Sequence, residues 1–168
     1  MLRKTGAKKM KVLIVDDEQD ILDSIGRILH PTKYDFNSTN DPLHAIELIR
    51  DDFYDAMILD VKMYPIDGIT LLKRIREFNN SIYVILITAY EEYSILEEAV
   101  NLHIYSFIKK PIEVKKLINI LREIEIKKKV LKHKEDEFAK IKINYDRLKK
   151  NFEKFSSGRE DFKKKFSK

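Results

Sequence analysis

The sequence contains no cysteine and no tryptophan, and it has only four glycines and four prolines among its 168 residues. Without cysteine the chain can form no disulfide, no thiolate zinc site and no cysteine nucleophile. Its glycines are too scattered to build a glycine-rich loop around the phosphates of a nucleotide. No apolar run is as long as a bilayer span, so we expect no membrane partner.

The start of the chain is basic, and it leads into only four consecutive apolar residues, Val12–Val15. This run is too short for the core of a secretory signal peptide. We therefore expect a cytoplasmic protein.

Charge is spread unevenly along the chain, whose net charge is +5. Residues 127–168 contain 16 Lys and Arg against 7 Asp and Glu, whereas residues 1–126 contain 17 and 21. An acidic body with a basic tail suggests two parts with different roles. A solvated helix face explains the basic tail most simply, and contact with nucleic-acid phosphates is the alternative.

Five short apolar runs alternate with five segments of helical periodicity over about 120 residues. The predicted strands lie in "KVLIVDD", "KYDFNSTN", "DAMILD", "SIYVILITA" and "IYSFIKK". One predicted helix has a clear start, with Asp41 as N-cap and Pro42 at its first position. This alternation predicts an α/β fold in which a parallel sheet is covered by helices on both faces.

Four of the five predicted strands end in residues that carry chemistry, namely Asp16 and Asp17, Asp60, Thr88, and Lys110. Because parallel strands end at one edge of the sheet, we expect these side chains to converge there. Three adjacent carboxylates repel one another and need a cation. Their hard oxygen ligands suit Mg²⁺ or Mn²⁺.

A metal ion beside a carboxylate favours phosphoryl transfer onto that carboxylate, and Lys110 offers a point charge to a phosphate or to Asp60. Each residue also has an ordinary explanation: Asp17 as a helix cap, Thr88 as a strand residue, Lys110 as an exposed lysine. Their joint occurrence at the strand ends favours the functional interpretation. The sequence thus predicts that Asp60 is phosphorylated.

Four motifs in this order carry a resemblance to a known family: "VLIVDDE", "ILDVKMYPIDG", "ILITAY" and "SFIKKP". Residues 10 to about 124 resemble the receiver domain of bacterial response regulators, as in chemotaxis regulators. The resemblance implies a doubly wound, flavodoxin-like sheet of five strands in the order 2-1-3-4-5. Together with the charge distribution and the periodicity of the tail, it divides the chain into three parts: a basic segment 1–9, the receiver 10–124, and a basic helical or coiled-coil extension 125–168.

The resemblance also assigns roles to single residues. It makes Asp60 the phosphoacceptor and places Mg²⁺ on Asp17, Asp60 and the backbone carbonyl of Lys62, with Asp16 holding the ion through water. Thr88 and Lys110 would bind the phosphoryl oxygens.

Further roles concern the switch that follows phosphorylation. Thr88 and Phe107 would form the switch pair, with Phe107 as the rotating aromatic, and the bond before Pro111 would be cis. Lys62 and Tyr90 would flank the path of the hydrolytic water. Neither side chain orients water, so we expect slow dephosphorylation.

The sequence departs from the family pattern at two loops. In the acceptor loop Tyr64 follows the methionine, so the proline comes one residue later, at Pro65. The Gly-Ala pair usual before the fifth strand is replaced by His103 and Ile104, which leaves the conformation of that turn open.

The tail follows a seven-residue repeat. One series contains Leu117, Ile124, Leu131, Phe138, Tyr145 and Phe152, and a second, three residues later, contains Ile120, Ile141, Leu148, Phe155 and Phe162. Lys127 and Lys134 interrupt the second series, and the "SSG" at 156–158 is expected to end or interrupt the helix. The repeat predicts a coiled-coil homodimer. A helix folded back on its own receiver, or one that docks on another protein, remains open.

These observations predict a response regulator that accepts a phosphoryl group from a sensor histidine kinase or a histidine phosphotransfer protein and then switches its contacts with an unknown downstream protein. It would phosphorylate and dephosphorylate itself and would not be a classical enzyme. The alternatives are a transcriptional or nucleic-acid regulator acting through the basic tail, which the sequence does not favour, and a pure phosphorelay intermediate.

Overall fold

A computed structural model describes residues 9–89 and 93–165. Five strands alternate with five helices in the order that the sequence predicts. The elements are β1 (Lys11–Val15), α1 (Gln19–Leu29), β2 (Asp35–Thr39), α2 (Pro42–Asp51), β3 (Ala56–Asp60), α3 (Gly68–Arg76), β4 (Tyr83–Thr88), α4 (Tyr93–Asn101), β5 (Ser106–Lys109) and α5 (Val114–Lys165).

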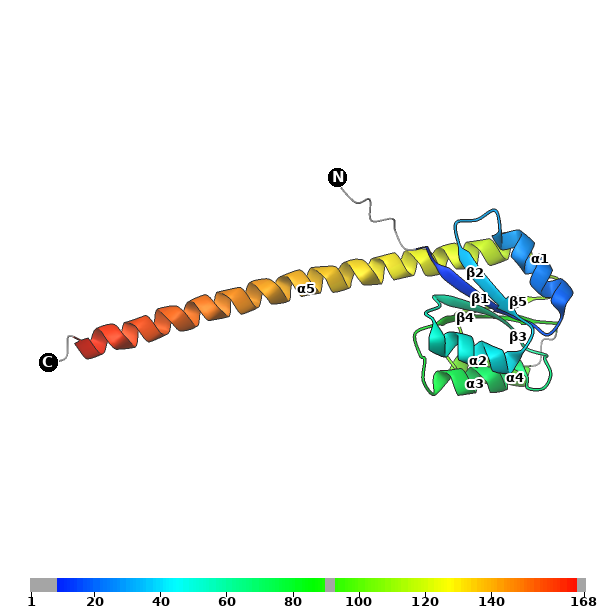
Figure 1. Cartoon of the computed structure of the whole chain (residues 1–168), viewed down its shortest axis with the longest axis horizontal. Helices are drawn as coiled ribbons and strands as arrows, with labels where there is room; N and C mark the ends of the chain where they lie inside the picture. Colours follow the sequence, from blue (N-terminus) through cyan, green and yellow to red (C-terminus); the bar gives the residue numbers. More distant parts are fainter. Residues whose placement is uncertain (1–8, 90–92, 166–168) are drawn as a thin grey trace. The chain divides into compact units, whose positions relative to one another are not determined.

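The five strands, which are labelled in Figure 1, form one parallel sheet. Their order in the sheet is β2-β1-β3-β4-β5. Strand β3 is completely buried because it lies in the middle of the sheet, whereas β2 lies at an edge and is mostly exposed. The predicted fold class and strand order are therefore confirmed.

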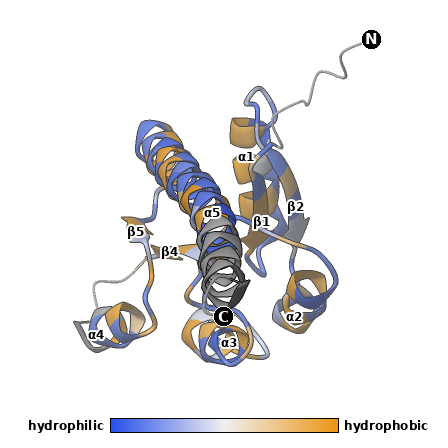
Figure 2. Ribbon diagram, turned by 90° about the vertical axis from the view of Figure 1, so that its left-hand side faces the viewer, coloured by the Kyte–Doolittle hydropathy of each residue, from blue (hydrophilic) through white to orange (hydrophobic). Residues whose placement is uncertain are grey.

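Helices cover both faces of the sheet (Figure 2). One core packs α1 and the start of α5 against the sheet, and its buried residues include Leu22, Ile25, Leu117 and Ile124. The other core packs α2, α3 and α4 against the opposite face. Continuous apolar strands were the sequence signal for this two-sided burial.

Helix α2 begins as the sequence predicts. Asp41 is its N-cap and accepts a hydrogen bond from the backbone N–H of Leu43, and Pro42 is its first residue. Helix α3 begins in the same way, with Asp67 accepting from the N–H of Thr70. Both caps supply acceptors to backbone donors that have no partner within the helix.

The turn between α4 and β5 departs from ordinary backbone geometry at His103, which has a φ of 55°. The guanidinium of Arg76, at the end of α3, donates to the backbone oxygens of Leu102 at 2.9 Å and His103 at 3.3 Å. It also donates to Asn79 and Ile82. Arg76 thereby ties this turn to α3 and to the start of β4.

The chain divides into two compact units, residues 1–125 and 126–168. The second unit consists of the later part of α5, in which every side chain from Lys129 to Lys150 is exposed. The prediction that Ser156–Gly158 ends or interrupts the helix is wrong, because α5 continues to Lys165. A single glycine costs a helix only about 1 kcal/mol, which strong helix formers on both sides offset. No described helix is both long and apolar enough to span a membrane.

Candidate functional site

Three carboxylates lie together at the carboxyl ends of β1 and β3. Asp16 follows β1, Asp17 comes next, and Asp60 ends β3. The strands pair with Val15 beside Leu59, which brings Asp16 and Asp60 next to each other. One oxygen from each of the three carboxylates lies within 4.8 Å of the others. Asp16 and Asp60 are buried, at 1% and 3% exposed, whereas Asp17 is exposed.

Backbone hydrogen bonds hold these acids in place. One Asp16 oxygen accepts from the N–H of Glu18 at 2.9 Å, and Asp17 accepts from the N–H of Tyr64 at 3.1 Å. The N–H of Lys62 donates to the Asp60 carboxylate. The loop after β3 is therefore tied to both acid-bearing strand ends.

Gly68 closes this loop against the backbone of β3. Its N–H donates to the oxygen of Val61 at 2.8 Å. A Cβ at this position would overlap the backbone oxygen of Asp60 and lie 3.1 Å from the Cα of Val61. The close approach requires glycine and fixes where Asp60 ends its strand.

Lys110 brings an ammonium group into the acidic cluster. Its Nζ lies 2.9 Å from Asp60 and 3.2 Å from Asp16, and the carboxylate of Glu18 is 3.5 Å away. Its backbone N–H donates to the oxygen of Thr88 at 2.8 Å, so β4 positions it. Thr88 itself is buried, at 5% exposed.

Burial controls the ionisation of this cluster. It raises the pKa of Asp60 above the ordinary value, although the hydrogen bond from Lys110 lowers it in part. Burial likewise raises the pKa of Asp16. Burial lowers the pKa of Lys110, but its bonds to Asp60 and Asp16 outweigh this, and the pKa lies above the ordinary value. The single ammonium group of Lys110 thus does not fully offset the cost of burying two carboxylate charges, those of Asp16 and Asp60.

The chemistry of these donors fits a divalent cation. Carboxylate oxygens are hard ligands of the kind that Mg²⁺ and Mn²⁺ prefer, and the exposed Asp17 leaves one side of the cluster open to solvent. An ion held by Asp16, Asp17 and Asp60 would supply the positive charge that the cluster lacks.

The structure also describes most of the remaining predicted site residues. Lys62 is exposed. Phe107, on β5, is 44% exposed and has the Nζ of Lys116 at 5.7 Å from its ring centre. The Lys110–Pro111 bond is cis, and the Tyr64–Pro65 bond is cis as well. Tyr90 lies outside the described residues.

Glu18 was missed by the sequence analysis. It is the N-cap residue of α1, and its carboxylate lies within ion-pair reach of Lys110. The signal was present, because Glu18 directly follows the acidic pair in "DDE". Glu18 does not end a strand but precedes a helix, so the grouping of strand ends does not include it.

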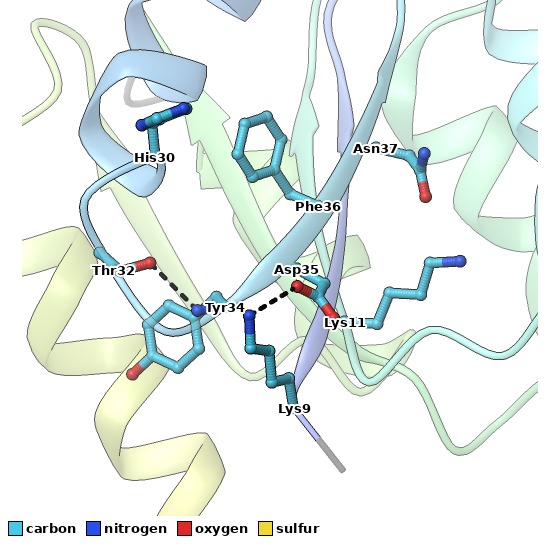
Figure 3. Close-up of a pocket in the computed structure, with 8 residues that line it drawn as sticks. All are labelled: Lys9, Lys11, His30, Thr32, Tyr34, Asp35, Phe36 and Asn37. Carbon is cyan, nitrogen blue, oxygen red and sulfur yellow. Dashed lines mark hydrogen bonds and ion pairs between the residues drawn. The ribbon is translucent and has the colours of Figure 1, made fainter.

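A second hollow lies at the opposite ends of β1 and β2 (Figure 3). It is lined by basic and polar side chains, among them Lys9, Lys11 and His30. Its lysines pair with nearby acids: Lys9 with Asp35 at 3.4 Å, and Lys11 with Asp52. Since these ammonium groups already have acidic partners, the acidic cluster is the stronger candidate site.

Comparison with known proteins agrees with this geometry. The sequence model of the response regulator receiver domain matches residues 12–122. The chain belongs to this family. The receiver is 31% identical over 116 residues to the transcriptional regulatory protein ZraR of Klebsiella oxytoca. This match covers 69% of this chain and 26% of ZraR. It is 27% identical over 113 residues to the sporulation initiation phosphotransferase F of Bacillus subtilis, covering 67% of this chain and 91% of that protein.

Solved structures show the same fold. A signal receiver domain of an HD domain-containing protein from Pseudomonas fluorescens Pf-5 is 28% identical, with a TM-score of 0.67, and covers 70% of this chain and 94% of that one. A CheY-like receiver from Methanospirillum hungatei JF-1 is 24% identical, with a TM-score of 0.69, and the match covers 73% of this chain and 98% of that one. A further relative, the protein MrkE of Klebsiella pneumoniae, is 29% identical over 119 residues. The chain spans less than half the length of ZraR and of MrkE, so the receiver alone accounts for the likeness to them.

Proposed function

We propose that Asp60 is the phosphoacceptor of a two-component response regulator. The observation that carries this is the position of Lys110, whose Nζ lies 2.9 Å from Asp60 within a cluster of three carboxylates. A carboxylate oxygen of Asp60 would attack the phosphorus of a phosphohistidine. The new P–O bond forms as the P–N bond breaks, and the leaving imidazole takes up a proton.

The other site residues would stabilise the charge of the transferred group. Asp16, Asp17, Asp60 and the backbone carbonyl of Lys62 would hold Mg²⁺ or Mn²⁺, which supplies charge neutralisation when it is bound. Lys110 and the hydroxyl of Thr88 would bind two of the phosphoryl oxygens. The chain would act on itself and not as an enzyme on a separate substrate.

The phosphodonor would be a sensor histidine kinase or a histidine phosphotransfer protein, as is general for receivers. Phosphorylation would shift Thr88 and Phe107 and so change the surface formed by α4 and β5. We propose that the protein acts in the cytoplasm on a downstream protein. We further propose that the tail forms a homodimer whose receiver arrangement changes on phosphorylation.

Labelling with a small phosphodonor tests the proposal. Wild-type protein incubated with acetyl phosphate and Mg²⁺ should gain one phosphoryl group by intact-mass spectrometry, and Asp60→Asn should gain none. Asp41→Asn is a matched control, because asparagine caps a helix as well as aspartate, and it should be labelled normally. Labelling of Asp60→Asn, or of wild type in excess chelator, would contradict the proposal.

Two other functions are less well supported. A nucleic-acid regulator would use the basic tail. The lysines of the tail, however, are interspersed with the apolar residues of the seven-residue repeat, and the described residues contain no recognisable module that reads a base sequence. A gel shift that weakens with salt would support it. A pure phosphorelay intermediate would pass the phosphoryl group on to a second histidine protein, and the name of the B. subtilis relative as a phosphotransferase makes this worth testing.

A further inference from the structure

The later part of α5 carries a line of large apolar side chains that nothing in the described structure covers. Leu131, Phe138, Ile141, Tyr145 and Leu148 are between 45% and 77% exposed. They follow one another at intervals of seven, three, four and three residues, which places them on one face of the helix. This face, which also includes Lys134, is called the seam below. In Figure 2 hydrophobic positions recur along α5 among hydrophilic ones.

The seam begins after the body ends. Leu117 and Ile124 belong to the same seven-residue series, but both are fully buried in the core of the first unit. The part open to another chain therefore starts at Leu131. A lone amphipathic helix of this kind is marginal in water, and burying its apolar face is what stabilises it.

We propose that the seam binds the seam of a second copy of this chain as a parallel, in-register, two-stranded coiled coil. The inference deepens the homodimer proposed above by naming its orientation and its residue pairs. In this register Phe138 and Tyr145 face their own copies, as do Ile141 and Leu148, so every apolar residue of the seam meets an apolar residue.

The charges that flank the seam fit this orientation. In a parallel coil, the residue just before a position of the first seven-residue series, such as Phe138, lies opposite the residue five places later on the other chain. This rule places Glu137 of each copy opposite Lys142 of the other, which gives two pairs of opposite charge. Both side chains are exposed on the single helix, and Glu137 also lies 3.5 Å from His133 of its own chain.

Lys134 is a polar residue within the seam. In the parallel register it faces its own copy, which costs stability, but Glu135 of the second copy flanks the same layer and offers each ammonium group an opposite charge. A polar residue at a seam position specifies register at a cost in stability. Slipping one chain by a heptad would place Lys134 against Ile141 and is disfavoured for this reason.

An antiparallel pairing fits the charges less well. With Phe138 set against Ile141 of the second copy, Leu131 faces Leu148 and Glu135 faces Lys142. The same register places Lys128 opposite Lys149 in two symmetric positions, and these like charges repel. In the parallel register no such pair meets at the flanking positions of 130–150, and the one like-charge contact of that stretch is Lys134 facing its own copy within the seam.

Single-cysteine cross-linking of the full chain tests orientation cleanly, since the natural sequence has no cysteine. In a parallel coil Leu148→Cys meets its own copy and should oxidise to a covalent dimer. In the antiparallel register the two thiols introduced by Leu148→Cys would lie about 25 Å apart along the helix axis and would not cross-link. In that register a cross-link would form only when the Leu148→Cys chain is mixed with the Leu131→Cys chain. Ile143→Cys, on the outer face, is the control and should not cross-link in either arrangement.

A charge exchange tests the residue pair. Lys142→Glu should raise the dimer dissociation constant about tenfold, because two attractive pairs become repulsive. Adding Glu137→Lys should restore affinity to within about threefold of wild type, whereas adding Glu135→Lys should not. Sedimentation velocity on the full chain gives both values.

Three results would overturn the inference. They are a monomeric full chain at tens of micromolar, a dimer that cross-links only through the Leu131–Leu148 mixture, or rescue of Lys142→Glu by Glu135→Lys. Labelling of Asp60 is measured separately on the same variants and is expected to be normal in all of them, so failure of the coil leaves the phosphoacceptor proposal standing.

Discussion

Gly68 illustrates how a single residue sets the geometry of the acidic cluster. Gly68→Ala should lower the free energy of unfolding by about 2 kcal/mol or more, because its Cβ overlaps backbone that cannot move without displacing Asp60. Chemical denaturation with a circular dichroism readout measures this, and labelling of Asp60 should fall as well.

Gly26 supplies the matched control in α1. A Cβ there would lie 3.5 Å from the nearest atom of Phe36, an ordinary contact. Gly26→Ala should therefore stabilise the protein by about 0.5–1 kcal/mol through helix propensity. If both alanine variants lost similar stability, the close-approach argument at Gly68 would be wrong.

Asp60 should make the stability of the metal-free protein depend on pH. Burial raises its pKa in the folded state, so the folded protein holds this proton more tightly than the unfolded chain does. Protonation of Asp60 therefore contributes stability to the folded state. This contribution is complete below the ordinary aspartate pKa and is lost as pH rises through the raised pKa of Asp60 in the folded protein. The amide that replaces the carboxyl group in Asp60→Asn cannot titrate. In chelator, the unfolding free energy of wild type minus that of Asp60→Asn should therefore rise as pH falls from about 7 to 4. A flat difference across this range would contradict the burial argument.

The turn between α4 and β5 shows strain at the scale of one element. His103 is exposed and has a positive φ, a conformation that costs a residue with a Cβ about 1–2 kcal/mol and costs glycine nothing. His103→Gly should thus stabilise the protein by about 0.5–1 kcal/mol in thermal unfolding after its greater chain entropy is counted. His103→Ala keeps the Cβ and should bring no such gain; an equal gain from both would point to the imidazole instead of the backbone.

Most elements could be predicted from sequence because their signals are local. The Asp41–Pro42 start of α2 and the buried runs of β3 and β4 follow from capping and hydrophobicity alone. The effect of Ser156–Gly158 on α5 was mispredicted, because a local helix-breaking signal was given more weight than the long helical context around it. The φ of His103 was left open because it depends on Arg76, which is far away in sequence.

Metal binding should appear as a property of the whole molecule. A ligand that binds only the folded state at 100 times its dissociation constant adds about 2.7 kcal/mol. Saturating Mg²⁺ should accordingly raise the melting temperature of the wild type by several degrees. Asp17→Asn should abolish most of this increase while keeping the metal-free melting temperature near that of wild type, because Asp17 is exposed. An unchanged Mg²⁺ response in that variant would remove Asp17 from the proposed ligand set.

Convergence of the site was predictable at the scale of the molecule, but its distances were not. Strand ends in a parallel sheet share an edge, so Asp16, Asp17, Asp60 and Lys110 could be grouped from sequence. Sequence does not show that Lys110 contacts Asp16 as well as Asp60, because that depends on how the side chains pack at the strand ends. It also gave no sign that Asp17 accepts the N–H of Tyr64, which depends on the path of the loop after β3.

The exposure of every side chain from Lys129 to Lys150 has a consequence for hydrogen exchange. Amide protons in this stretch are protected by helix formation alone when the chain is single, and local fraying opens such a helix at little cost. The body's amides, by contrast, open only with the core. Deuterium uptake in the tail should therefore slow as protein concentration rises while uptake in β1, β3 and β4 stays constant, so that one exchange experiment reports chain association residue by residue without an attached probe.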